Sequence, residues 1–402
     1  MRIIIAYFEK FIETSGGLEH MSCTLANAFA EKGHDVAIVY CFGREGKPFY
    51  QLNPAVKLYN LMAINPDKWK QETLGQCIPA GKKLIRELIR VVSKSKARNW
   101  NEKAKGQLII GEIQQVVNEF KPDVILSMRY ETSNYIINSA RVTVPVVSRS
   151  FMAPKIMLRD APQGEIDALK KSYAVHVQLK EDTSLIQRMI PGINVVWIPN
   201  PVPQYEKHAM LENHQKPFRI INVARLNKAQ KRQHLLIEAF SRLAKQYPDW
   251  NLEFWGEEND GHHGYKEELL SLIAKHHLEN RVFLRGQTNK VYDISLGADI
   301  FAFPSAYEGF SNAMAEALSV GLPNVVYRSA PAVSALVEDG VTGLLCDDGP
   351  DGLAKSLKIL MDNRELRVQM GRNATKSMQQ FSPEAVFDKW ESILKQAAFA
   401  EK

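Results

Sequence analysis

Residues 300–320 read IFAFPSAYEGFSNAMAEALSV, and this stretch decides the fold. The apolar run 300–303 predicts a buried strand, and the apolar spacing that follows predicts a helix over 312–320. A short loop that holds Glu308 and Gly309 lies between them. A buried strand followed by a helix is the repeating unit of parallel α/β folds.

The same alternation recurs in both halves of the chain. The first half has predicted strands at 2–7, 36–40, 123–127 and 144–148, and predicted helices at 18–32 and 106–120. The second half has strands at 219–223, 251–255, 282–283, 300–303 and 324–326, and helices at 231–246, 265–276, 289–296, 312–320 and 331–337. Because proline-rich residues 198–203 separate the halves, we predict an α/β protein with two Rossmann-like domains, 1–200 and 201–380, and a final segment 381–402.

The composition excludes several classes of protein. With 402 residues, 45% of them hydrophobic and 24% charged, the chain has the balance of a globular protein. We find no apolar run near the ~18 residues of a membrane helix, and the first apolar stretch is too short for a signal peptide. The four scattered cysteines predict reduced thiols and a cytoplasmic protein. Nucleotide-binding glycine motifs, hydrolase elbows and zinc spacings are missing, which disfavours dehydrogenases, P-loop kinases and hydrolases.

Two carboxylate pairs could in principle hold a metal ion with a diphosphate. They are Asp347 with Asp348, and Glu258 with Asp260. Both pairs are typical of polar loops, and we therefore expect no metal ion and no cofactor.

The loop before the predicted helix 312–320 could bind an anionic ligand. Gly309 would let the backbone approach a ligand closely, and Ser311 is the expected N-cap. The amides of Phe310, Ser311 and Asn312 would point out of the helix N-terminus, where partial positive charge favours anions. Glu308 lies in the same loop. An acidic helix start of purely structural value fits the same residues.

Glu316 falls in the second turn of that helix. A carboxylate can accept hydrogen bonds from both hydroxyls of a vicinal diol, as in a ribose or a hexose. A sugar, a diphosphate and a ribose joined in sequence therefore match the order from Glu308 through the amides to Glu316. A solvated surface position is the alternative for Glu316.

Two further groups of residues follow predicted strands. Arg225 closes the strand 219–223 and Lys231 opens the next helix, so two cations at one turn could bind a diphosphate and stabilise it as a leaving group. Ordinary surface charge is the alternative. Gly16 and Gly17 follow the first strand, where glycine allows a phosphate or sugar to approach, although a simple turn would also use them.

The run from Glu308 to Glu316 resembles the Glu-x7-Glu signature of retaining glycosyltransferases of the GT-B fold, in the large family-four group. The segments 16–20, 32–36 and 198–202 resemble that group's N-terminal loop, helix–strand junction and interdomain segment. Arg225 with Lys231 resembles its phosphate-binding pair, and 319–323 and 337–345 resemble its late C-terminal pattern. The similarity covers nearly the whole chain.

The resemblance implies a role for each of these residues. An N-terminal domain would bind the acceptor, and a C-terminal domain would bind a nucleotide-sugar, with the last helix crossing back to the first domain. Glu316 would hold the ribose, and Glu308 and the amides of 309–312 would face the donor sugar and diphosphate. Arg225 and Lys231 would bind the diphosphate, Gly17 would close over it, and the loop 286–290 would contact the base. It also implies metal-independent catalysis, with front-face attack assisted by the departing phosphate and no dedicated nucleophile.

One position departs from the family pattern. Where many relatives carry a histidine, or Glu-Arg-Asn, after an N-domain strand, this chain has Ser148, Arg149, Ser150 and Phe151. Arg149 could replace the missing group as a substrate contact, or it could be structural. His20 and Arg129 are weaker candidates on the acceptor side.

Positive charge gathers in residues 81–106, which carry a net charge of +7 in a chain of net +6. The apolar residues between 84 and 92 fall on one helical stripe with cations around it. A basic amphipathic helix suits an anionic membrane surface, and a core-facing helix with a solvated back fits equally well. Nucleic acid is disfavoured, because no binding motif accompanies the charge.

The favoured function is transfer of a hexosyl or N-acetylhexosaminyl group from a nucleotide-sugar, with UDP as the expected nucleotide. The acceptor would be a cell-surface glycan or a lipid-linked molecule at the inner face of the plasma membrane. Another GT-B enzyme, such as a sugar-nucleotide epimerase or a phosphorylase, and a non-catalytic nucleotide-sugar binder are the alternatives.

Overall fold

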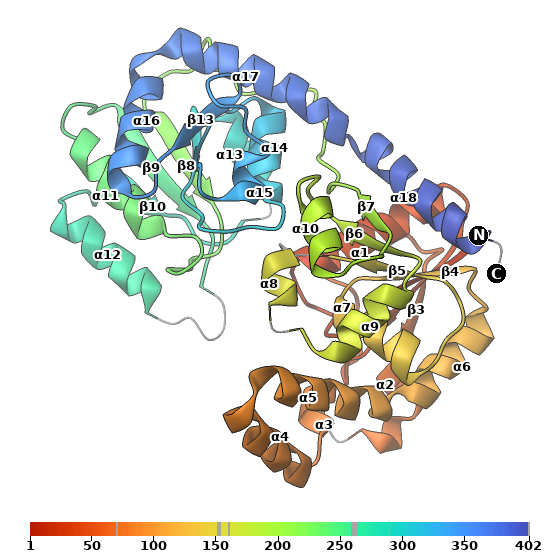
Figure 1. The fold of residues 1–402 in the computed structure, drawn as a ribbon. Helices are drawn as coiled ribbons and strands as arrows, with labels where there is room; N and C mark the ends of the chain where they lie inside the picture. The colour runs from red at the N-terminus through yellow and green to blue at the C-terminus, as the bar shows by residue number, and fades with distance from the viewer. Residues whose placement is uncertain (70, 151–153, 160, 259–263, 289, 401–402) are drawn as a thin grey trace. The chain divides into compact units, whose positions relative to one another are not determined.

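The computed structural model describes residues 1–69, 71–150, 154–159, 161–258, 264–288 and 290–400. The chain divides into two compact units (Figure 1). The first unit is Met1–Pro199 together with Val386–Lys402, and the second unit is Asn200–Ala385. Each unit is built on a parallel sheet with helices, and the predicted α/β fold with two Rossmann-like halves is confirmed.

In the first unit the described residues form a seven-stranded sheet in the order β3-β2-β1-β4-β5-β6-β7. Its strands are β1 (Arg2–Tyr7), β2 (Asp35–Tyr40), β3 (Lys57–Asn60), β4 (Val124–Ser127), β5 (Val146–Arg149), β6 (Ala174–Val177) and β7 (Val195–Trp197). Its helices are α1 (Gly17–Glu31), α2 (Leu61–Ile64), α3 (Leu74–Cys77), α4 (Ala80–Val92), α5 (Lys94–Leu108), α6 (Ile110–Phe120), α7 (Tyr130–Asn134), α8 (Pro154–Leu158), α9 (Gln163–Lys171), α10 (Asp182–Met189) and most of α18 (Pro383–Ala398).

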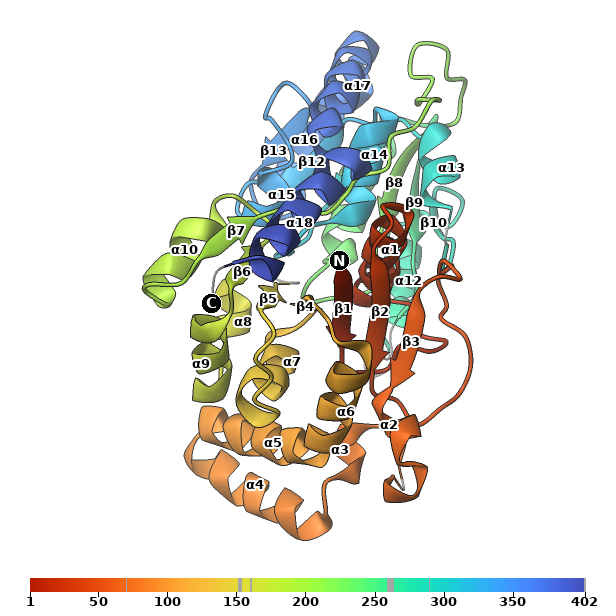
Figure 2. The same cartoon turned by 90° about the vertical axis from the view of Figure 1, so that its right-hand side faces the viewer.

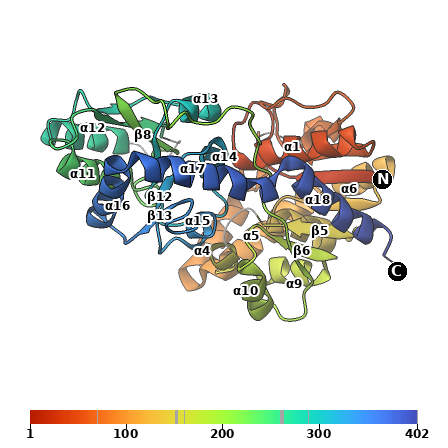
Figure 3. The same cartoon turned by 90° about the horizontal axis from the view of Figure 1, so that it is seen from above.

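Side chains of β1 alternate between two cores, as the two-residue period of a strand requires. Ile3 and Ile5 pack with α1 and α18, whereas Ile4 and Ala6 pack with α6. Figure 3 shows α1 and α18 beside each other, and Trp390 of α18 is only 1% exposed in the core that they share. The C-terminal helix is therefore an integral part of the first unit.

In the second unit the described residues form a six-stranded sheet in the order β10-β9-β8-β11-β12-β13. Its strands are β8 (Phe218–Val223), β9 (Trp250–Trp255), β10 (Val282–Leu284), β11 (Ile300–Phe303), β12 (Asn324–Tyr327) and β13 (Gly343–Cys346). Its helices are α11 (Gln233–Leu243), α12 (Tyr265–Lys275), α13 (Val291–Leu296), α14 (Asn312–Val320), α15 (Pro331–Ser334), α16 (Pro350–Asp362) and α17 (Arg364–Met378).

The strand order of the second unit reverses between β8 and β11. These two strands are parallel neighbours, with Ile220 opposite Ile300 and Ile221 opposite Phe301. The loops that follow them therefore meet at the carboxyl edge of the sheet, which is where open α/β sheets bind ligands. Arg225 and Lys231 lie in the first of these loops, and Glu308 lies in the second.

Some predicted elements were wrong in extent. The predicted helix 106–120 is the end of α5 and the whole of α6, because the helix is interrupted at Ile109. Helix α11 begins at Gln233 rather than at 231, because Arg232 adopts a left-handed conformation (φ 53°, ψ 38°). The strands β3, β6, β7 and β13 were not predicted. Among the residues that the structure describes, we find no helix long and apolar enough to cross a membrane.

Candidate active site

Lys231 and Glu308 form an ion pair at the carboxyl edge of the second sheet. The Lys231 Nζ lies 2.5 Å from Glu308 Oε1 and 4.8 Å from the centre of the Phe303 ring. The two side chains are 11% and 10% exposed. Burial lowers the pKa of Lys231, while the Glu308 carboxylate opposes that shift. Two residues that we had assigned separate ligand contacts are thus partners of each other, which the sequence did not reveal.

Hydrogen bonds between the two loops hold this pair in place. The amide of Ala306 donates to the carbonyl of Gln230 (2.8 Å), and the Gln230 side chain donates back to the carbonyl of Tyr307 (3.1 Å). The amide of Lys231 donates to the carbonyl of Asn227 (2.9 Å) within its own loop. The loops after β8 and β11 therefore form one structure around the ion pair.

Arg225 lies near Lys231 and is exposed. Its charge contributes to the lowered pKa of Lys231, so the two predicted phosphate-binding cations are brought together. The loop that carries Arg225 continues the pairing of β8 with β9, since the amide of Ala224 donates to the carbonyl of Trp255 (2.9 Å). Gly256 permits this contact, because a Cβ there would stand 2.0 Å from the Ala224 carbonyl oxygen. The sheet itself thereby fixes the position of Arg225.

The N-terminus of α14 presents free backbone amides. Ser311 occupies the predicted N-cap position, but its hydroxyl makes no capping hydrogen bond. Within the described residues, the amides of Phe310, Ser311 and Asn312 donate no hydrogen bond. The ring of Phe310 packs edge-on against Phe381, with the ring centres 6.2 Å apart. Phe310 therefore offers its amide, rather than its ring, to a ligand.

Asn200 also reaches this helix end. Its Nδ2 donates to Asn312 Oδ1 at 3.0 Å, which ties the start of the second unit to the first turn of α14. Gly309 is half-buried in the loop beside Glu308. The sequence did not indicate Asn200, because a contact between residues more than a hundred positions apart produces no local sequence pattern.

Glu316 lies in the second turn of α14 and is partly exposed. No hydrogen bond or ion pair to its carboxylate is found in the part of the chain that the structure describes. Burial raises the pKa of Glu316 to about 7. The Glu316 charge in turn contributes, after burial, to a raised pKa of Tyr205, so this phenol lies close by. A half-buried carboxylate without a donor among the described residues is suited to accept hydrogen bonds from a ligand.

Tyr205, which lies close to Glu316, belongs to a pair of stacked tyrosines that the sequence did not indicate. Tyr205 stacks on Tyr292 of α13, with ring centres 4.0 Å apart and planes within 14°. In the predicted base-contacting loop, the Gly286 carbonyl accepts a hydrogen bond from the amide of Gly256 (2.8 Å). Asn289 of that loop lies outside the described residues.

In the first unit, Gly16 and Gly17 begin α1. Gly16 is the extended N-cap residue, and a Cβ on it would stand 2.3 Å from Glu19 Oε2. The Tyr7 hydroxyl donates to Glu19 Oε1 (3.0 Å). A Cβ on Gly17 would meet no neighbouring atom within 4 Å, so the backbone is open on that side. The carboxylate of Glu19 therefore fills the space beside Gly16 but not beside Gly17.

The remaining candidates of the first unit differ in exposure. Arg149 ends β5 and is only 2% exposed, and burial lowers its pKa to about 10. Phe151, which follows shortly, lies outside the described residues. Arg129 is paired with Glu131 (3.1 Å), and the ring of the exposed His20 lies 4.8 Å from that of Tyr50. Arg149 is thus buried at the carboxyl edge of the first sheet.

The described residues contain no group of three or more His, Cys, Asp or Glu side chains placed to hold a metal ion. Asp348, from one of the carboxylate pairs, instead lies 3.3 Å from Arg232. Asp260, from the other pair, lies outside the described residues.

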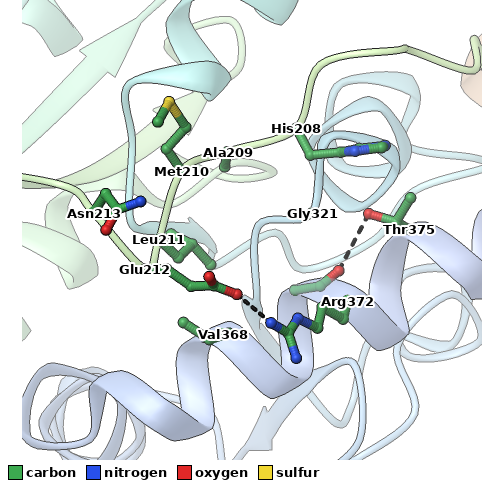
Figure 4. Close-up of a pocket in the computed structure, with 11 residues that line it drawn as sticks. His208, Ala209, Met210, Leu211, Glu212, Asn213, Gly321, Val368, Arg372 and Thr375 are labelled. Atoms are coloured by element: carbon green, nitrogen blue, oxygen red, sulfur yellow. Dashed lines mark hydrogen bonds and ion pairs between the residues drawn. The ribbon is translucent and has the colours of Figure 1, made fainter.

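A cavity of about 400 Å³ opens at the opposite end of α14, beside its C-cap Gly321 (Figure 4). It is lined by Met210, Leu211 and Thr375, and by the paired Glu212 and Arg372. The predicted site residues do not line it, and it lies a full helix length from the free amides.

Comparison with known proteins gives a consistent result. Residues 204–377 match the family described as Glycosyl transferases group 1. An uncharacterised glycosyltransferase of Haemophilus influenzae is 26% identical over 392 residues, which are 97% of this chain and 99% of that protein. A Campylobacter jejuni N-acetylgalactosamine-N,N'-diacetylbacillosaminyl-diphospho-undecaprenol 4-alpha-N-acetylgalactosaminyltransferase is 34% identical over 149 residues, 37% of this chain and 38% of the relative. The solved structure of Anabaena HepE in complex with UDP and glucose covers 98% of this chain and 100% of its own, with a TM-score of 0.69 and 18% identity.

Two Rossmann-like units, with strand-order reversals at β1 and β8, define the GT-B class of fold. Residues 204–377 match the glycosyltransferases of group 1, and the resemblance of the sequence to glycosyltransferases of the group 1, or family-four, type is confirmed.

Proposed function

We propose that this glycosyltransferase moves a hexosyl or N-acetylhexosaminyl group from a UDP-sugar to a lipid-linked or cell-surface glycan, with retention of anomeric configuration and without a metal ion. The observation that carries the donor assignment is the N-terminus of α14. Along the chain, the amides of 310–312, which donate no hydrogen bond within the described residues, stand between Glu308, paired with Lys231, and Glu316, whose carboxylate has no partner among those residues. That order matches a sugar, a diphosphate and a ribose joined in sequence.

The charges of the site suit the departure of a diphosphate. Negative charge grows on the phosphate oxygen as the bond to the sugar breaks, and preorganised donors stabilise it. The amides of 310–312 and the cations Arg225 and Lys231 supply such donors, and the two cations take the place that a divalent metal would fill. A diphosphate that contacts Lys231 would compete with Glu308 for this cation, which would free the Glu308 carboxylate to accept a hydrogen bond from a donor-sugar hydroxyl.

The acceptor and the nucleotide are supported by similarity. The Campylobacter jejuni relative is named for an acceptor carried on diphospho-undecaprenol, and HepE was solved with UDP and glucose. We assign Gly17 and Arg149, at the carboxyl edge of the first sheet, to the acceptor-binding unit. The free thiols of Cys23, Cys41, Cys77 and Cys346 support a reducing, cytoplasmic location.

Thermal shift across UDP-, GDP- and ADP-sugars is the first test, because a tight ligand stabilises the folded form by mass action. We expect UDP-sugars to raise Tm most. Transfer from the best donor to a polyprenyl-diphosphate glycan is then followed by NMR of the product's anomeric centre, with and without EDTA. Inversion of configuration, loss of activity in EDTA, or conversion of the donor without an acceptor would each contradict part of the proposal.

A further inference from the structure

The helix α4 carries its apolar residues on the outside of the first unit. Within Ala80–Val92 no side chain is buried. The large apolar side chains are strongly exposed: Leu84 65%, Ile85 47%, Leu88 63%, Val91 88% and Val92 82%. We call these five residues the α4 ridge. Because the α4 ridge is exposed, the alternative interpretation, in which the apolar stripe of this helix packs against the core, is excluded.

The side of α4 that faces the protein is formed by the half-buried Lys83, Arg86 and Ile89 instead. Lys83 donates to the carbonyl of Gln76 (3.2 Å), and Arg86 contacts Asn101 of α5 (3.5 Å). Figures 1 and 2 show α4 as the outermost helix, with α5 between it and the rest of the first unit. This orientation is the reverse of an ordinary surface helix, which buries its apolar stripe. Exposed apolar patches of this kind mark interaction sites.

Charge around the ridge indicates what covers it. Lys82, Lys94, Lys96 and Lys103 are exposed, and among the described residues none of them has a carboxylate within ion-pair distance. Two copies of the chain meeting through α4 would bring together two segments of net charge +7. An anionic surface is complementary to this charge, and a helix with an apolar face flanked by lysines lies in the interface of an anionic bilayer.

Ion pairs connect this surface to the carboxyl edge of the first sheet. Arg98 of α5 lies 3.1 Å from Glu131 and 3.0 Å from Glu165. Glu131 also pairs with Arg129 (3.1 Å), which lies 3.7 Å from Glu9 in the loop after β1. The α4–α5 hairpin is therefore braced against the edge where a parallel sheet binds its ligand.

We propose that the α4 ridge is a membrane-docking surface that inserts into the headgroup region of an anionic bilayer. The ridge supplies apolar contact and the lysines attract the lipid headgroups. Docking through α4 would hold the carboxyl edge of the first sheet near the bilayer. Only the use of this placement, to reach a lipid-linked acceptor, rests on the proposed function.

Flotation of the full-length protein with vesicles tests this. The vesicles are phosphatidylglycerol with phosphatidylethanolamine, or phosphatidylcholine alone. We expect salt-sensitive binding to the anionic vesicles and weak binding to phosphatidylcholine. Leu88→Gln/Val91→Gln should remove most of the binding, and Lys82→Gln/Lys94→Gln/Lys96→Gln should weaken it by about ten- to a hundredfold. These side chains are exposed, so folding should be unaffected.

Matched controls are available in the second unit. Leu270→Gln/Ile359→Gln removes exposed apolar side chains, and Lys245→Gln/Lys275→Gln/Lys355→Gln removes exposed lysines. Both controls should bind vesicles like the unchanged protein. Equal binding to both kinds of vesicle, unchanged binding of the α4 variants, or a solution dimer that Leu88→Gln/Val91→Gln dissociates would overturn the proposal. Nucleotide-sugar thermal shifts should be the same in all variants, so failure here is distinguishable from failure of the donor assignment.

Discussion

The N-termini of α14 and α1 each follow a central strand, yet they are occupied differently. In α1 the third helical residue is Glu19, whose carboxylate accepts hydrogen bonds from its own backbone amide and from Tyr7. In α14 the same position holds Met314, which is fully buried. One helix start thus carries its own anion, and the other leaves its amides to a ligand.

This contrast teaches that a helix start is an anion site only when the chain does not fill it. A carboxylate at the third helical position stabilises the helix end and competes with an external anion for the same amides. The sequence marks both helices with glycine and glutamate nearby. The position of the carboxylate relative to the first turn distinguishes them, and the following predictions test that distinction.

Arg225→Ala should have the largest effect. We expect kcat to fall by about 10²–10³-fold, because the variant removes a cation from the developing charge of the leaving group. Since Arg225 is exposed, Tm should change little. Steady-state kinetics would be compared with Lys228→Ala, an exposed lysine in the same loop that pairs with Glu268. Equal rates for both variants would remove Arg225 from the mechanism.

Glu316→Gln should act mainly on affinity. Loss of a charge-assisted hydrogen bond to the ribose should weaken nucleotide binding by about ten- to a hundredfold in calorimetry. The folded-state pKa of Glu316 is raised to about 7, so the carboxylate binds a proton more readily in the folded chain than in the unfolded chain. Ionisation of Glu316 therefore lowers the free energy of unfolding as the pH rises from the ordinary pKa of a carboxyl group to about 7.

Above pH 7, Glu316→Gln should consequently be more stable than the unchanged protein, despite its weaker binding. The exposed Glu279 provides the control variant Glu279→Gln. A Glu316→Gln protein that binds normally would show that the partnerless carboxylate is not a ribose contact.

The effect of pH on donor binding should be smaller than the effect of the Glu316→Gln substitution. Ionised Glu316 is the better acceptor, so the affinity for UDP-glucose should fall by up to about tenfold for each pH unit below the pKa of about 7. Calorimetry across this range measures the slope. The Glu316→Gln profile should be flat, and a slope that persists in this variant must come from another group.

Gly17→Ala should give the smallest change and tests the α1 end directly. Alanine meets no atom within 4 Å there and suits a helix better than glycine, so the free energy of unfolding should rise by about 0.5 kcal/mol. Transfer should nevertheless slow, because a methyl group on the open side of this backbone would obstruct the approach of an acceptor sugar. A stabilised variant with unchanged turnover would place the ligand elsewhere.

The strand and the helix around the α14 loop could be predicted from the sequence. The strand is a continuous apolar run, and the helix has apolar residues at helical spacing. The helix 312–320 and the strand 300–303 were correct to the residue. The edge strand β3 was missed because it is polar and largely exposed, and β7 because it has only three residues. Local pattern carries little signal for such strands.

Site residues were predicted as types but not as contacts. The chain order indicated Arg225, Lys231, Glu308 and Glu316, but it contained no sign that Lys231 and Glu308 pair with each other. The stack of Tyr205 on Tyr292 and the bond from Asn200 to Asn312 were also missed. Such contacts depend on three-dimensional packing between segments far apart in the chain, which single-sequence periodicity does not encode.

The discontinuity of the first unit bears on how the protein is made. Residues Val386 to Ala397 supply buried side chains to a core whose other members are synthesised before the second unit begins. During translation the emerging first unit lacks Trp390, and the core that includes Phe29 and Leu25 stays incomplete until the ribosome has completed the second unit. The first unit can therefore complete its core only after the second unit has been synthesised. Its apolar surface stays exposed for that time and is a binding site for chaperones that shield such surface.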